Sequence, residues 1–212
     1  MDSNVVQEQN QPTVLIKIGK FFLFITIFVV GFLLSAIKLP EHFILISDTL
    51  PEGNLNFKVQ NRLSVIIFFV LLLLLFGKKY IGMFSIAPLK KKGTYLWIIG
   101  LLVVALFLQF QPFSFRLLPF TFGEYLQLFF ILVIIAPIEE ELFYRGLLIL
   151  IPSTKIKYIM LIISSVLFGL IHAAFWGSFI IGLVLGILAI RYRNILVTIV
   201  AHSLWNTFAM FF

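Results

Sequence analysis

The chain of 212 residues has no Cys, only 3 His, and only 12% charged residues. Without Cys it can form no disulfide, no thiolate metal site and no thiol nucleophile. A soluble domain has about 25% charged residues, so a soluble surface is not expected either. Apolar residues dominate instead, with 61% hydrophobic residues, 26 Phe and a mean hydropathy of +1.12. Such a composition is stable in lipid, where spanning segments must be helical, and it predicts an all-α integral membrane protein.

The apolar residues form separate runs of a length that suits membrane-spanning helices. The runs cover about 21–37, 63–77, 94–111, 124–151, 156–174, 177–190 and 194–212. We therefore expect a bundle of about seven transmembrane helices. The uncharged stretch 158–190 would extend for about 50 Å as one helix, so a turn is expected at 173–177.

The net charge of +7 arises from 16 Lys and Arg against 9 acidic residues. The loops are too short to build a nucleic-acid-binding face, so no nucleic-acid partner is expected. Sorting the basic residues by alternate loops puts most of them on one side, which we predict to be cytoplasmic. That side has Lys17, Lys20, Lys78, Lys79, Lys90, Lys91, Lys92, Lys155, Lys157, Arg191 and Arg193, and the other side has Lys38, Lys58, Arg62 and Arg116. The prediction is a multi-pass protein of the cell membrane with a cytoplasmic N-terminus and an external C-terminus.

Two glycines, Gly182 and Gly186, have the GxxxG spacing. Small residues at this spacing let two helix backbones approach closely in a membrane. We expect them to serve helix contact and not chemistry.

Three consecutive acids, Glu139–Glu141, interrupt the fourth apolar run. The stretch Tyr125–Ile138 would span only about 21 Å as a helix, too short for an easy crossing, and the chain is apolar again from Gly146. One long helix, loosened near Pro137, accounts for both facts better than an interfacial charge cluster. A charge at mid-membrane costs about 3 kcal/mol, so such residues usually face a protein interior or a watery cavity and mark function.

The spacing of these acids assigns their partners. Glu141 and Arg145 lie at i and i+4, in the favourable order for an ion pair, and are expected to neutralise each other. Glu140 projects about 100° away on the helix and is left without that partner. Glu140 is thus expected to be a lone carboxyl without a cationic partner in a low-dielectric site, which suits a general base that must take a proton from water and later return it. The role of Glu139 stays open, since its side chain could simply extend to the membrane interface or cap a helix.

Two later helices carry complementary polar residues. Phe168 and His172 lie at i and i+4 on one run, and His202 and Asn206 lie at i and i+4 on the last run. Each pair is therefore expected on one helical face. A single His in a span can be a satisfied packing residue, but two His and an Asn together with paired Glu residues point to one site.

The three patterns resemble those of the family of CAAX-prenyl-protein proteases and bacteriocin-processing or immunity proteins, the CPBP or Abi membrane proteases. That family is marked by EExxxR, FxxxH and HxxxN on successive membrane helices, which here fall at 140–145, 168–172 and 202–206. The resemblance covers about the last four helices, so 121–212 is expected to be the protease core. Residues 1–120 would then supply three helices of unknown role.

The resemblance implies a glutamic endopeptidase that hydrolyses a peptide bond without a covalent intermediate. Glu140 with His172 would activate a water, and His202 with Asn206 would donate hydrogen bonds to the oxyanion. Supporting roles are implied for Glu141, Arg145 and Phe168. The expected partner is a hydrophobic or lipidated peptide at the lipid bilayer, as in CAAX-type, pheromone or bacteriocin processing, with no cofactor.

Zinc is the alternative mechanism. Glu140, His172 and His202 could in principle form a His2Glu site with water in the fourth position, although the sequence has no HExxH motif.

Two alternatives belong to other functional classes. In a non-catalytic bacteriocin self-immunity protein, or a membrane scaffold or regulator, the same polar residues would merely hold helices together. A transporter could use Glu and His as a proton relay, but the chain shows no pair of repeats with interrupted helices.

Overall fold

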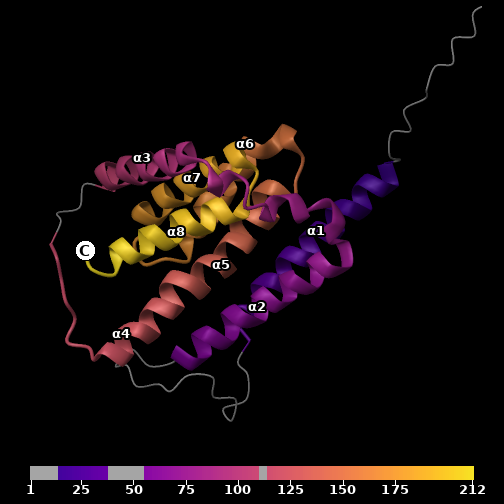
Figure 1. Cartoon of the computed structure of the whole chain (residues 1–212). Coiled ribbons are helices and arrows are strands. Elements are labelled where there is room, and N and C mark those ends of the chain that lie inside the picture. Colours follow the sequence, from indigo (N-terminus) through magenta and orange to yellow (C-terminus); the bar gives the residue numbers. More distant parts are fainter. Residues whose placement is uncertain (1–13, 38–54, 110–113) are drawn as a thin grey trace, which may run out of the picture.

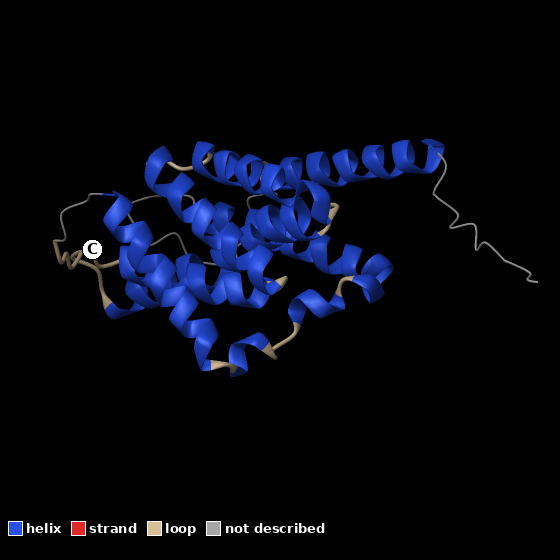
Figure 2. Ribbon diagram, turned by 90° about the horizontal axis from the view of Figure 1, so that it is seen from above, coloured by secondary structure: helices blue, strands red, loops and turns tan. Residues whose placement is uncertain are grey.

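The computed structural model describes residues 14–37, 55–109 and 114–212. Within these ranges every regular element is helical and no strand occurs. The helices form one bundle, in which α1 and α2 lie beside the long segment that contains α4 and α5 (Figure 1). Figure 2 shows the described residues as helices joined by loops. The predicted all-α membrane fold class is confirmed.

Each predicted apolar run falls on a helical segment. The segments are α1 (Val14–Leu34), α2 (Leu55–Phe76), α3 (Lys92–Gln109), the continuous stretch 122–150, α6 (Lys157–Leu170), α7 (Phe175–Tyr192) and α8 (Ile195–Ala209). Among the described residues, four helices are long and apolar enough to cross a membrane: Val14–Leu34, Leu55–Lys79, Lys92–Gln109 and Phe175–Tyr192. The number of crossings beyond these four stays a prediction.

The largest boundary error that bears on the site is at α2, which begins at Leu55 and not at 63. The sequence prediction placed the polar stretch before 63 in a loop. In the structure Gln60 and Asn61 are buried, and Asn61 Nδ2 donates to the carbonyl of Ser35 at 2.7 Å. The polar residues therefore face other helices instead of water, which is why they belong to the helix. The turn between α6 and α7 covers 171–174, overlapping the start of the predicted stretch.

The predicted long helix is confirmed and is unwound on both sides of the glutamates. α4 (Phe122–Phe129), a π-helical segment η4 (Phe130–Ile135), α5 (Ala136–Glu141) and a second π-helical segment η5 (Leu142–Leu150) follow one another without a gap. In η4 the N–H of Ala136 donates to Ile131, five residues back, and Pro137 has no N–H to donate. The carbonyls of Leu132 and Val133 thus lose their usual α-helical partners. Such π-helical segments are common at functional sites.

The two glycines of the GxxxG pattern bring α6 and α7 together, as predicted. A Cβ placed on Gly182 would lie 3.0 Å from Ser165 Cα, and one on Gly186 would collide with the Leu161 side chain. The helix backbones can therefore touch only because these positions have no side chain. Leu185 and Leu188, fully buried on the same helix, join the main apolar core there.

We expect Gly182→Val to destabilise the protein by about 1–3 kcal/mol, because the added methyl groups force α6 and α7 apart. Thermal unfolding of the purified protein in detergent measures the loss. Gly100→Val is the matched control, since a Cβ on Gly100 meets nothing within 4 Å. Equal stabilities of the two variants would show that the close contact contributes nothing.

Hydrogen bonds between described connecting segments occur at two places in the bundle. At the first place Asn194, between α7 and α8, donates through Nδ2 to the carbonyl of Ser85 at 2.7 Å, which joins two connections of the same predicted side. At the second place the N–H of Arg116 donates to the carbonyl of Phe211 at 2.8 Å. Each of these two contacts joins segments that the sorting of basic residues puts on the same side. Lys38 lies outside the described residues, and Lys58 and Arg62 lie within α2 and not in a loop. Which side faces the cytoplasm stays a prediction.

Candidate active site

The glutamates of α5 lie inside the protein and not at its lipid surface. Glu140 is 4% exposed, and Glu141 and Arg145 are each 0% exposed. α5 contacts both α2 and α8, so side chains from these helices meet it from two directions. Charged groups so deeply buried need partners, because removing an ion from water costs several kcal/mol.

Glu141 forms the predicted ion pair with Arg145. Arg145 Nη1 lies 3.0 Å from Glu141 Oε1, and Nη2 donates to the carbonyl of Gly182 on α7 at 3.3 Å. The guanidinium carbon lies 4.5 Å from the centre of the Phe168 ring, a cation–π distance. This group therefore links the long helix to α6 and α7.

His202 of α8 contacts both glutamates of the EExxxR motif. Its Nδ1 lies 2.9 Å from Glu141 Oε1, and its Nε2 lies 3.7 Å from Glu140 Oε2. A carboxylate only accepts hydrogen bonds, so Nδ1 carries a hydrogen in this contact. Glu141 thereby fixes the ring with Nε2 toward Glu140, an orienting role that carboxylates often have for functional histidines.

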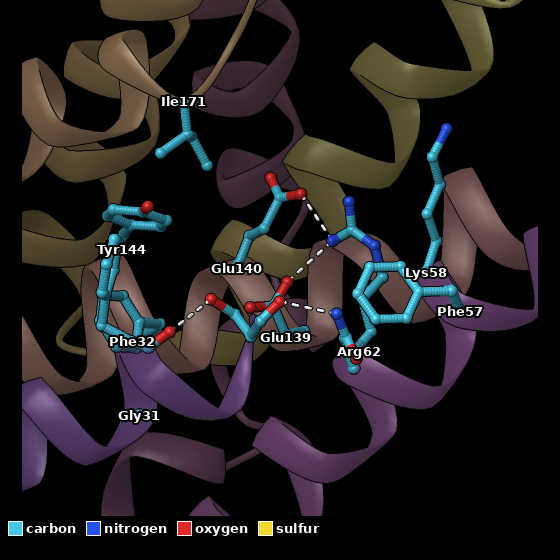
Figure 3. Close-up of a pocket in the computed structure, with 12 residues that line it drawn as sticks. Gly31, Phe32, Phe57, Lys58, Arg62, Glu139, Glu140, Tyr144 and Ile171 are labelled. Carbon is cyan, nitrogen blue, oxygen red and sulfur yellow. Dashed lines mark hydrogen bonds and ion pairs between the residues drawn. The ribbon is translucent and has the colours of Figure 1, made fainter. Parts of the chain in front are cut away.

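Arg62 of α2 is the member of the site that the sequence did not predict. Its Nη1 lies 2.7 Å from Glu139 Oε2 and 2.7 Å from Glu140 Oε1, and Figure 3 shows it reaching toward both acids. The prediction that Glu140 lacks a cationic partner was therefore wrong. The sequence did contain one signal for Arg62. The residue directly precedes the apolar run 63–77, on the side of the membrane with few basic residues.

His172 lies just beyond the end of α6 and contacts Phe168, as their spacing predicts. The two ring centres are 4.5 Å apart, and Nδ1 is 2.7 Å from the Phe168 carbonyl. Since a carbonyl accepts, Nδ1 carries the hydrogen and Nε2 is left with a free lone pair. The histidine that approaches Glu140 is His202, with 3.7 Å between Nε2 and Oε2.

Asn206 binds the long helix where that helix is unwound. Its Nδ2 donates to the Leu132 carbonyl at 2.8 Å, and Ser203 Oγ donates to the Val133 carbonyl at 2.7 Å. These are the two carbonyls that η4 and Pro137 deprive of their α-helical partners. The HxxxN helix is thus attached to the glutamate helix beside the site, and one Asn206 amide hydrogen is occupied.

A pocket of about 290 Å³ opens onto the glutamates. Arg62, Glu139 and Glu140 line its polar part, while Phe32 of α1 and Phe57 of α2 belong to its apolar wall (Figure 3). Because α1 and α2 supply this wall, the pocket exists only with the N-terminal helices in place. Its mixed lining is typical of ligand sites, which combine apolar walls with a few polar groups.

The zinc alternative would need three ligands close together. Within the residues that the structure describes, no group of three or more His, Asp or Glu side chains is arranged to hold a metal ion. Glu140 and His202 approach each other, whereas His172 has Nδ1 bound to the Phe168 carbonyl and only Nε2 left to coordinate.

Comparison with known families adds one match. Residues 122–208 match the model of the Rce1-like family, described as type II CAAX prenyl endopeptidase Rce1-like. This segment is Rce1-like. All three motifs of the sequence fall inside the match, so the family resemblance predicted from them is confirmed there. No curated protein and no solved structure matches the chain.

The match of this segment supports a protease, which is a hydrolase. The CAAX type is a description of the matched family. The matched segment starts at α4 and leaves α1, α2 and α3 outside. Arg62 and the apolar wall of the pocket therefore come from a part of the chain that the family match does not cover.

Proposed function

We propose that the protein is an intramembrane, metal-independent endopeptidase in which Glu140 activates a water to cleave a membrane-associated or lipidated peptide. The observation that carries the proposal is the environment of Glu140. This buried carboxylate lines the pocket, has one oxygen bound to Arg62 and has the other 3.7 Å from His202 Nε2. A general base needs such a position, within reach of a pocket and yet shielded from bulk water.

In the proposed reaction Glu140 takes a proton from water while the water oxygen attacks the scissile carbonyl. His172 helps Glu140 to activate the water, because its Nε2 is free to accept a hydrogen bond while Nδ1 is bound to the Phe168 carbonyl. The tetrahedral intermediate collapses when Glu140 returns the proton to the amide nitrogen. The C–N bond then breaks and leaves an amine and a carboxylic acid, which loses its proton to water or to the amine.

His202 and Asn206 are proposed to stabilise the oxyanion. With Nδ1 bound to Glu141, a protonated His202 presents Nε2–H on the Glu140 side. Asn206 keeps a second amide hydrogen beside the one given to Leu132. A positioned oxyanion donor is worth about 3–4 kcal/mol of transition-state stabilisation in acyl-transfer enzymes.

The apolar wall of the pocket and the lipid-facing helices suit a hydrophobic or lipidated peptide that arrives from the bilayer. We therefore propose the peptide and the lipid bilayer as the partners, with no nucleic acid. The proposed location is the cell membrane, crossed several times, with the N-terminus in the cytoplasm, where the excess of basic loops would lie.

Purified protein in liposomes should cleave a peptide that carries a C-terminal lipid, with one new carboxyl terminus detected by mass spectrometry. A chelator such as EDTA or 1,10-phenanthroline should leave the rate unchanged, because Glu140 and the two histidines act without zinc. Loss of activity with the chelator, restored by added zinc, would replace this mechanism by the zinc alternative.

A non-catalytic self-immunity protein or membrane scaffold is the second candidate. One observation favours it: the polar network also fastens the long helix to α7 through Arg145 and to α8 through His202. In that case the glutamates would serve helix assembly alone, and removing the Glu140 charge would leave the biological role intact.

A further inference from the structure

We propose that Arg62 of α2 is a positioning residue of the active site, which anchors Glu140 and neutralises Glu139. The inference rests on the proposed endopeptidase function and deepens it. It extends the catalytic unit beyond the Rce1-like segment at 122–208 to an N-terminal helix.

One guanidinium nitrogen holds both carboxylates. Arg62 Nη1 is 2.7 Å from an oxygen of Glu139 and 2.7 Å from an oxygen of Glu140. Side chains of consecutive helical residues diverge by about 100°, so their meeting at one nitrogen fixes both rotamers. The Arg62 side chain is 26% exposed, against 12% and 6% for the two glutamates, and it lies at the pocket, where a small solute can approach it.

The start of α2 is fixed well enough to place Arg62. Leu55 and Val59 are buried in a small apolar cluster with Ile131 and Ile135 of the glutamate helix. On the other side Asn61, next to Arg62, is tied to the end of α1 by its hydrogen bond to Ser35. The guanidinium is therefore held relative to the glutamates by backbone that is packed on both sides.

Anchoring one oxygen of Glu140 determines which oxygen can react. Oε1 is bound to Arg62, whereas Oε2 is buried, has no hydrogen-bond partner within the described structure and is the oxygen that faces His202. An unpartnered buried carboxylate oxygen is costly and is the atom expected to accept a hydrogen bond from the attacking water. Arg62 thus presents Oε2 as the base.

The charge of Arg62 also acts on Glu139. Two carboxylates side by side in a medium of low dielectric repel each other, so an unneutralised Glu139 would displace Glu140 or take up its proton. The shared Arg62 nitrogen removes that conflict. In a variant without Arg62, we expect most of the loss of activity to come from the uncompensated charge on Glu139.

The test uses the full-length protein in liposomes and measures kcat and KM for the lipidated peptide. Arg62→Ala should lower kcat by about 10- to 100-fold with a smaller change in KM, because a misplaced catalytic group costs about that much. Arg62→Lys should retain an intermediate rate. Adding Glu139→Gln to Arg62→Ala should recover part of the loss, and added guanidinium chloride at millimolar concentration should restore part of it as well.

Arg116→Ala is the matched control, since Arg116 is an exposed arginine of the loop 114–121 and lies away from the pocket. It should neither lose activity nor respond to guanidinium. Melting temperatures of all variants separate a loss of chemistry from a loss of fold. If Arg62→Ala does not fold, Arg62→Gln takes its place in the same comparisons.

Wild-type activity of a folded Arg62→Ala would overturn the proposal. The proposal would also be overturned if the fall in kcat simply paralleled a fall in melting temperature and neither guanidinium nor Glu139→Gln relieved it. Arg62 would then be purely structural. Glu140→Gln, assayed alongside, separates the two levels of inference. If it is inactive while Arg62→Ala is active, only the role of Arg62 fails, whereas an active Glu140→Gln removes the proposed function itself.

Discussion

Replacing Glu140 by Gln should lower kcat/KM for peptide cleavage by about 10³-fold while the protein keeps its fold. A general base contributes about 10²- to 10⁴-fold to a rate, and Gln cannot take the proton from water. Gln has nearly the same shape, and its Oε1 can still accept from Arg62, which now donates to Glu140 at 2.7 Å. Steady-state kinetics with the purified protein, together with its melting temperature, measure both parts of the expectation.

Glu124→Gln is the matched control for this experiment, because it makes the same chemical change on the same long helix. Glu124 lies at the first turn, where it forms a capping box with Thr121, remote from the pocket. The Glu124→Gln variant should cleave the peptide at the wild-type rate. If Glu140→Gln and Glu124→Gln were equally active, Glu140 would not be the base.

Replacing Arg145 by Ala should have the largest effect on stability. Arg145 and Glu141 are each 0% exposed and form an ion pair at 3.0 Å. Removal of one partner of a buried pair leaves a charge without compensation and costs about 3–5 kcal/mol. Arg145→Ala also removes the cation from the face of the Phe168 ring. We expect a large fall in melting temperature and a low yield of monodisperse protein in detergent.

Removing both charges should recover part of that stability. In Arg145→Met with Glu141→Gln no charge is left unpaired, and the amide oxygen can still accept from His202 Nδ1, which lies 2.9 Å from Glu141 Oε1. Arg116→Ala, at an exposed arginine, should change stability by less than about 0.5 kcal/mol. If the double variant were as unstable as Arg145→Ala, the loss would come from packing and not from the unpaired carboxylate.

Periodicity and composition predicted the helices well because lipid imposes one strong rule. Apolar runs long enough to cross the bilayer must be helical, and every predicted run overlaps a described helical segment. Spacing within a helix was equally informative. It predicted the ion pair of Glu141 with Arg145 and the close contact of α6 with α7 at Gly182.

The contacts between helices were harder to predict, because helical spacing does not tell which side chains of separate helices meet. Arg62 was assigned to a loop since polar neighbours such as Gln60 and Asn61 hide the start of α2 from an apolar-run criterion. The bond from Asn206 to Leu132 depends on a carbonyl freed by the π-helical segment, and no residue pattern announces that segment apart from Pro137.

The two histidines illustrate the same limit. The HxxxN pattern placed His202 correctly on α8, whereas His172 of the FxxxH pattern lies just beyond the end of α6. The tautomer of His172 follows from a local contact with the preceding turn, and that of His202 follows from a tertiary contact. The Phe168 carbonyl leaves His172 Nε2 as an acceptor, and Glu141 orients His202 toward Glu140. The proposed division between an accepting and a donating histidine thus became visible only in three dimensions.

The central claim, a peptidase that depends on Glu140, is tested most directly by comparing membrane peptidomes. Cells that express the wild-type protein are compared with cells that express Glu140→Gln at the same level, and C-termini of membrane peptides are mapped by mass spectrometry. We predict at least one uncut precursor that accumulates with Glu140→Gln and a matching C-terminal product that disappears. Identical peptidomes, with the biological role preserved in the Glu140→Gln cells, would contradict the account and favour the scaffold.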